Sequence, residues 1–137
     1  MDLQQHLKNA MEKSEKVRPK VGGFPYLAEC LRREGFLKNM WQLPSATSFY
    51  ISEDDALVIP GKSLIDGAST CPKFNKEKLI AILRIDQAGQ TTFLEFLENT
   101  WGAGVVKYEV DFINRNVIYY GLNGEEYRED YMAVKID

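Results

Sequence analysis

Four side chains near the C-terminal end of the chain could do chemistry together. Glu109 and Asp111 stand two positions apart in the run VVKYEVDF, so a strand would place both carboxylates on one face. Depending on strand register, Tyr119 and Arg128 could lie beside them. Two carboxylates with a tyrosine or an arginine between them could transfer protons or bind a cation. The same residues could equally form cross-strand charge pairs, each worth roughly a few tenths of a kcal/mol.

Shorter motifs elsewhere do not complete a catalytic or cofactor-binding pattern. The GKS run at 61–63 ends like a phosphate-binding loop, but Ala56 stands where that loop needs its first glycine. The GAG run at 102–104 lacks the third glycine of a dinucleotide fingerprint and precedes a predicted strand. His6 is the only histidine, and we expect it on an exposed helical face, away from any catalytic set. We therefore expect no cofactor.

The two cysteines do not suggest a metal site or a disulfide. Cys30 and Cys71 are far apart and form no CxxC pair, and one histidine does not complete a zinc set. Cys30 occupies a core-facing position of a predicted helix, where a thiol behaves as a small apolar side chain. We expect no bound metal.

Charge and hydropathy exclude several classes of protein. The net charge is -3, with +2 over residues 1–20 and -3 over residues 105–137. No basic surface is evident that could follow a phosphate backbone, so nucleic-acid binding is not expected. No apolar run reaches the roughly 20 residues of a membrane span, and the polar N-terminus lacks the apolar region of a signal peptide. We expect a soluble chain in the cytoplasm.

The first half of the chain predicts two helices and a small antiparallel meander. Residues 2–16 carry a thin apolar stripe at helical spacing, so this helix must dock on the body or on a partner. Pro25 opens a second helix over 25–34, and Gly35 suits its left-handed C-cap. Turn clusters then separate three predicted strands, at 36–43, 47–52 and 56–60.

The second half predicts a long irregular segment, two more helices and three strands. Residues 61–74 have no periodicity, while 75–88 are apolar on most faces, which predicts a buried helix. Thr92 and Glu95 form a capping box that opens the next helix. Residues 105–134 then alternate as a second meander, and Asn123-Gly124 predicts a type I′ hairpin turn. The resulting fold class is α+β, with antiparallel strands packed against about four helices and no internal repeat.

The order of several short motifs is similar to a bacterial family that is classified only as a domain of unknown function. The similarity covers about residues 24–130, and some members of that family are labelled "phage envelope protein". This chain has no membrane segment that would fit such a label. The resemblance implies a small α+β domain and transfers no catalytic residue. The motifs that carry it are Phe24-Pro25-Tyr26, Leu31-Arg32, Gly35, Gly89-Gln90-Thr91, Phe93, Phe96, Ala103-Gly104-Val105, Tyr108, Val110-Asp111, Arg115, Tyr119-Tyr120-Gly121, Gly124, Tyr127 and Glu129.

Two hypotheses about function follow. We predict an amphipathic helix within residues 1–20 and a single α+β domain over 21–137. The first hypothesis is a cytoplasmic binding or protein-interaction module without catalytic activity, with a protein partner or a second copy of the chain. It would act through the C-terminal sheet or the 61–74 segment. The alternative is a small-ligand binder or enzyme that uses the acidic and tyrosine residues of that sheet. A deep concave site containing Asp111 would favour the alternative.

Overall fold

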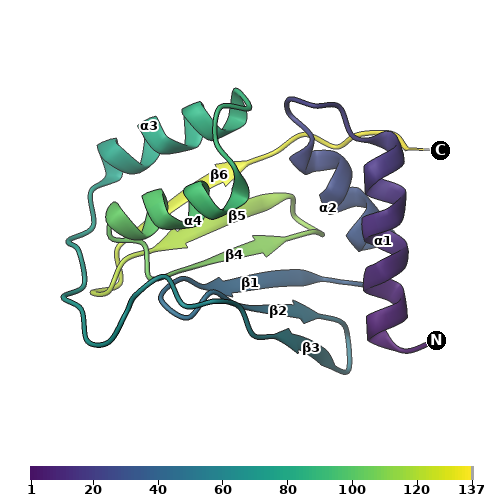
Figure 1. Cartoon of the computed structure of the whole chain (residues 1–137). Coiled ribbons are helices and arrows are strands. Elements are labelled where there is room, and N and C mark those ends of the chain that lie inside the picture. Colours follow the sequence, from purple (N-terminus) through teal and green to yellow (C-terminus); the bar gives the residue numbers. More distant parts are fainter. Residues whose placement is uncertain (137) are drawn as a thin grey trace.

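The alternating patterns of both halves form strands, and the strands join into a single sheet. The first meander is β1 (Lys38–Gln42), β2 (Thr47–Ile51) and β3 (Ala56–Ile59). The second is β4 (Lys107–Asp111), β5 (Asn116–Tyr120) and β6 (Glu126–Asp130). In the computed structural model, which describes residues 1–136, they pair antiparallel in the order β3-β2-β1-β4-β5-β6 (Figure 1). The predicted α+β class is confirmed.

A pair of helices precedes each meander. These are α1 (Leu3–Val17) and α2 (Phe24–Arg33), then α3 (Lys76–Gln87) and α4 (Phe93–Gly102). Local side chains begin three of them, because Asp2, Asn75 and Thr92 each accept a backbone N–H of the first turn. Glu95 completes the predicted capping box with Thr92. Helices α3 and α4 lie over the second meander, and α1 and α2 gather at the opposite end of the sheet (Figure 1).

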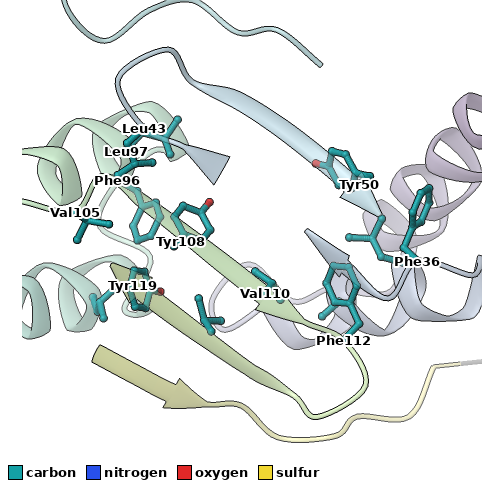
Figure 2. Packing of buried hydrophobic residues seen from close by; sticks show 14 of the residues in the cluster. Phe36, Leu43, Tyr50, Phe96, Leu97, Val105, Tyr108, Val110, Phe112 and Tyr119 are labelled. Atoms are coloured by element: carbon teal, nitrogen blue, oxygen red, sulfur yellow. The ribbon is translucent and has the colours of Figure 1, made fainter. Parts of the chain in front are cut away.

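The helices cover one face of the sheet, and the core lies between them. Along β4, Tyr108 and Val110 are buried while their neighbours are half-buried, as a strand with one covered face requires. Phe96 of α4 packs edge-on against Tyr108, and Phe36 after α2 packs in the same way against Tyr50 (Figure 2). We call the side that carries these residues the covered face and the opposite side the open face.

The two halves of the chain repeat the same structure, which corrects the prediction of no internal repeat. A shift of 69 positions carries α2 onto α4, β1 onto β4 and β2 onto β5 with no insertion. The central strands pair around Met40 and Glu109, which are themselves equivalent, so the halves are related by a local two-fold axis there. Five equivalent pairs in this span are identical, namely Phe24 and Phe93, Glu29 and Glu98, Gly35 and Gly104, Lys38 and Lys107, and Tyr50 and Tyr119.

Backbone details follow the same repeat. Gly35 and Gly104 both have positive φ, at 99° and 88°, just before their strands. Equivalent hydrogen bonds also recur across the centre of the sheet. The Leu43 N–H donates to the Val106 carbonyl and the Phe112 N–H donates to the Leu37 carbonyl, both at 3.0 Å. The repeat is hard to recognise in the sequence because most equivalent apolar positions carry different apolar residues in the two halves.

Two local predictions need correction, on α3 and on the β5–β6 turn. Helix α3 is not buried on most faces, because it lies outermost over the edge of the sheet; Leu79 and Leu83 are buried but Ile85 is 45% exposed. The β5–β6 turn is not type I′, since Gly124 has φ 85° whereas Asn123 does not have positive φ. The β4–β5 turn takes its positive φ at Arg115, not at the flanking asparagines.

The 61–74 segment is irregular, as predicted, and it lies against the end of the sheet. The Ser63 hydroxyl donates to the Pro44 carbonyl at 3.0 Å, and the Leu64 N–H donates to the same carbonyl at 2.9 Å. At its far end Phe74 lies against Gly104 and Gly121, where any side chain larger than hydrogen would clash. This segment therefore connects β3 to α3 along a path that contacts both meanders.

Candidate functional site

The Asp111 carboxylate is engaged by the loop that follows β4. It accepts hydrogen bonds from the Ile113 N–H and the Asn114 N–H, both at 2.9 Å, and from Asn114 Nδ2 at 2.8 Å. Burial alone would raise the pKa of Asp111, but these hydrogen bonds from Asn114 and Ile113 lower it below the usual value. An ionised carboxylate that is bonded in this way serves to hold the turn.

Glu109 and Arg128 lie in one row of the open face, but Ile118 on β5 separates them. Glu109 instead contacts Lys107 at 3.8 Å and the Tyr120 hydroxyl at 3.5 Å. Arg128 forms a separate contact with Asp130, at 3.7 Å. The ion pairs of Glu109 and Arg128 therefore run along their own strands and do not join the two residues across the sheet.

Tyr119 points the other way, into the covered face. It is buried, and burial raises the pKa of its hydroxyl. Its ring stands between those of Tyr108 and Tyr127, with ring centroids 5.6 Å and 6.4 Å away. Trp41 extends this row across the central strands at 6.4 Å from Tyr108. The fold therefore brings Glu109, Asp111 and Arg128 to one face, and places Tyr119 in a core row of aromatic rings.

A polar cluster that the sequence analysis missed lies where α3 meets β6. The Glu129 carboxylate pairs with Arg84 Nη2 at 2.6 Å. It also accepts hydrogen bonds from Gln87 Nε2 at 3.0 Å and from the Tyr127 hydroxyl at 2.6 Å. Burial would raise the pKa of Glu129, but these three partners, Arg84 first, lower it. The alternation of EYRED could have indicated it, because Glu129 shares a face with Tyr127. The cluster fastens α3 to the edge of the sheet.

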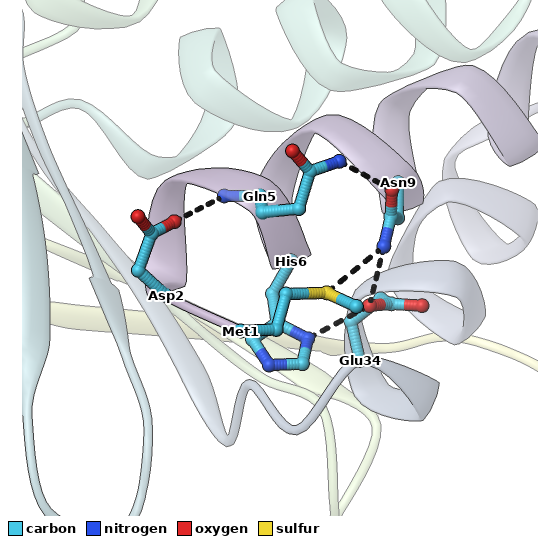
Figure 3. A network of polar contacts seen from close by, with 6 residues as sticks. All are labelled: Met1, Asp2, Gln5, His6, Asn9 and Glu34. Carbon is cyan, nitrogen blue, oxygen red and sulfur yellow. Dashed lines mark hydrogen bonds and ion pairs between the residues drawn. The ribbon is translucent and has the colours of Figure 1, made fainter.

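His6 is also more engaged than predicted. Its Nδ1 lies 2.9 Å from Glu34 Oε1, which joins α1 to the end of α2 (Figure 3). Asn9 Nδ2 lies 3.5 Å from the same oxygen and 3.2 Å from Met1 Sδ. His6 was expected on an exposed helical face; it is half-buried instead, and its contact with Glu34 helps to dock α1 on the body. In residues 1–136 no group of His, Cys, Asp and Glu side chains is arranged to hold a metal ion.

Neither of two grooves on the described surface contains the predicted residues as a set. The larger, of about 530 Å³, runs between α1 and β3. The smaller, of about 360 Å³, lies beside the β1–β2 turn and is lined by Gln42, Pro44, Ser45, Val106 and Lys107. Asp111 lines neither groove. No helix in the described part of the chain has the length and apolar character that crossing a bilayer requires.

The most distinctive surface is the open face itself. One row crosses all six strands, and in it four apolar side chains stand in register with two charged ones. None of the described helices packs on this side, and the charged residues of β4 and β6 border the row; at its β3 end, Val58 also lines the groove beside α1. In strand order from β3 to β6 its members are Val58, Phe49, Met40, Glu109, Ile118 and Arg128.

Together these features define an α+β protein with a repeated helix-pair and meander unit and one open sheet face. The chain belongs to the family described as "Protein of unknown function (DUF1398)", whose model matches residues 12–129. Uncharacterized proteins of Mycobacterium bovis and Mycobacterium tuberculosis are 47% identical to it over 118 residues, which is 86% of this chain and 72% of each relative. The predicted family resemblance is confirmed. Neither the family description nor these names mention a phage envelope.

Proposed function

We propose that this protein is a non-catalytic interaction module inside the cell, which binds a protein partner through the open face of its sheet. The observation that carries the proposal is the row of Val58, Phe49, Met40 and Ile118, in which Glu109 stands between Met40 and Ile118 and Arg128 ends the row at β6. Phenylalanine and methionine are enriched in protein interfaces, where they are combined with polar and charged groups. The Asp111 carboxylate is bonded within the β4–β5 turn, so we assign this residue a structural role at the edge of the open face.

The partner's surface would be extended and weakly apolar. A flat sheet face offers no deep pocket for a small ligand, and ligand sites are concave. The charges on the open face are of both signs, with Lys107 beside Glu109 and Arg128 beside Asp130. Mixed charges suit a protein surface with its own alternating charges and do not suit a phosphate backbone.

Site-specific photo-cross-linking in cells tests this proposal. A photoreactive phenylalanine analogue replaces Ile118 on the open face, and Glu98 on the exposed side of α4 is the control position. The position on the face should give one defined product with another protein, and the control should not. The captured protein is then purified, and Arg128→Glu should weaken its binding at least about tenfold. Equal products at both positions, or an unchanged affinity, would show that the open face is not the interface.

A further inference from the structure

The two outer strands of the sheet occupy equivalent places in the repeat, but of the two only β6 carries charged side chains. Strand β6 reads EYRED, with Glu126, Arg128 and Asp130 exposed along it. Strand β3 reads ALVI and carries no charge, and Val58 is 50% exposed. Charged side chains on an edge strand oppose the addition of another strand, and an apolar edge invites it. Strand β6 therefore serves as an internal control for β3.

The helix that flanks each edge shows the same contrast. At β6, Glu129 is bonded to Arg84 and Gln87 of α3, and Lys76 of α3 lies 5.6 Å from the ring centre of Tyr127. At β3 the corresponding place is the open groove of about 530 Å³. Its lining is mainly apolar, and consists of Gln4, Leu7, Lys8, Met11, Leu57, Val58, Ile59 and Pro60. Polar contacts therefore tie β6 to α3, whereas an open groove lies between α1 and β3.

The free edge of β3 also has backbone groups available at the right place. The Ser52 N–H donates to the Asp55 carbonyl at 2.8 Å, which sets the alternation of the β2–β3 ladder. Leu57 and Ile59 then direct their backbone groups toward β2, and Val58 directs its N–H and C=O outward.

We propose that a second copy of this chain pairs with the first along β3, antiparallel and centred on Val58. In that arrangement the two Val58 residues exchange both backbone hydrogen bonds. The acidic run at 53–55 of each copy meets the other copy near Lys62, so Asp54 faces an opposite charge. The pairing closes the α1–β3 groove of each copy. It also extends the sheet in the same antiparallel sense as the β1–β4 pair at the centre of each chain. This contact uses the strand edge, and the proposed partner surface is the open face.

Sedimentation velocity of the full chain, from about 1 µM to about 500 µM, tests the pairing. The wild-type chain should shift from monomer to dimer across that range. Val58→Lys should weaken the dimer at least about tenfold, because a charge at the axis meets its own copy. Ile113→Lys is the matched control, since Ile113 is 52% exposed in the β4–β5 turn, and it should dimerise like the wild type. A chain that stays monomeric throughout, or an unchanged dimer in Val58→Lys, would overturn the proposal.

A cross-linking measurement tests the register independently. Val58→Cys is made in a background with Cys30→Ala and Cys71→Ser, and Ile113→Cys in the same background is the control. Paired residues at the axis of an antiparallel ladder have Cα atoms about 5.5 Å apart, within the range of a disulfide. With an added oxidant, Val58→Cys should form a covalent dimer and the control should not. Equal cross-linking of both variants would show that contact at residue 58 is random.

Discussion

At the residue scale, the buried polar side chains differ in how well they are satisfied. Ser14 is buried, and its Oγ has no hydrogen-bond partner among the described residues. A buried hydroxyl without a partner loses its hydrogen bonds to water for nothing. Ser14→Ala should therefore raise the free energy of unfolding by about 1 kcal/mol in urea denaturation. The difference in stability between Glu15→Ala and Glu15→Ser, at an exposed position of the same helix, gives the contribution of helix propensity alone. A stabilisation by Ser14→Ala that is no larger than this difference would contradict the expectation.

Glu29 is the opposite case, a nearly buried carboxylate with several donors. It is 8% exposed and accepts hydrogen bonds from Arg32 Nε at 2.8 Å, Arg32 Nη2 at 2.7 Å and Arg33 Nε at 3.0 Å. Chiefly because of Arg32, the pKa of Glu29 falls to about 2. A carboxyl group whose pKa is lowered in the folded state stabilises the protein at pH values above its ordinary pKa. That stabilisation is lost as the pH falls toward 2.

The measurement compares wild type with Glu29→Gln between pH 2.5 and pH 7. Wild type should be more stable by roughly 1–3 kcal/mol near neutral pH, with the difference shrinking below about pH 4.5. Glu98, the equivalent residue of the second half, is exposed and provides the control. Glu98→Gln should change stability little at any pH. A difference for Glu29→Gln that does not depend on pH would mean that packing, and not charge, governs this position.

At the element scale, α1 is joined to the rest of the chain mainly through α2. It buries Ala10 and Ser14, contacts α2 and the edge strand β3, and is held by the pair of His6 and Glu34. We predict that it forms a unit that can detach from the rest, in keeping with a helix within residues 1–20 and a domain over 21–137.

Ala10→Glu tests this by placing a charge in the buried contact. Hydrogen exchange should rise within residues 3–17, because the helix undocks and a thin amphipathic helix is marginal alone. Amides of β1, β4 and β5 should keep their protection. Lys16→Glu on the exposed side of α1 is the control, and it should leave the exchange pattern intact. If the central strands lost protection together with α1, the helix would belong to the same cooperative unit.

Elements were predictable from the sequence where local chemistry decides them. The capping box of Thr92 and Glu95 and the glycine after α2 both depend on neighbours within a few residues. The exposure of Ile85 was not predictable, because it depends on where α3 lies over the sheet. The same holds for Tyr119, whose face is set by strand register. Glu109 and Asp111 were placed correctly on one face because they share a strand.

At the scale of the whole molecule, the repeat governs how the surfaces differ. Each half supplies a helix pair and a meander, and the second half closes its edge with charges and ion pairs while the first does not. If two chains pair along β3 as proposed, their open faces become parts of one continuous surface. A partner that binds the open face would then meet two copies of the same row, which would raise its overall affinity without any new contact.

The repeat is also testable through the backbone, because the two halves share a conformation and not a sequence. Ala46 and Arg115 are equivalent, and both have positive φ, at 52° and 55°. Such residues are strained there by roughly 1 kcal/mol, and glycine is not. Arg115→Gly should therefore raise the free energy of unfolding by about 0.5–1 kcal/mol in urea denaturation, despite the greater freedom of glycine in the unfolded chain. Ala46→Gly should gain less, because the buried Ala46 methyl group is lost.

Ile113→Gly controls for glycine in the same turn at a position without positive φ, and it should lower stability by about 1 kcal/mol. Substitution by glycine should thus raise the free energy of unfolding at residue 115 and lower it at residue 113, although the two residues lie in one turn. A similar loss at both positions would show that the left-handed conformation carries no strain in this turn. A gain at residue 115 with a smaller gain at residue 46 would show that both halves store the same local strain. Such a shared strain is expected when the turn geometry is imposed by the joining of two strands and not by the residue that occupies it.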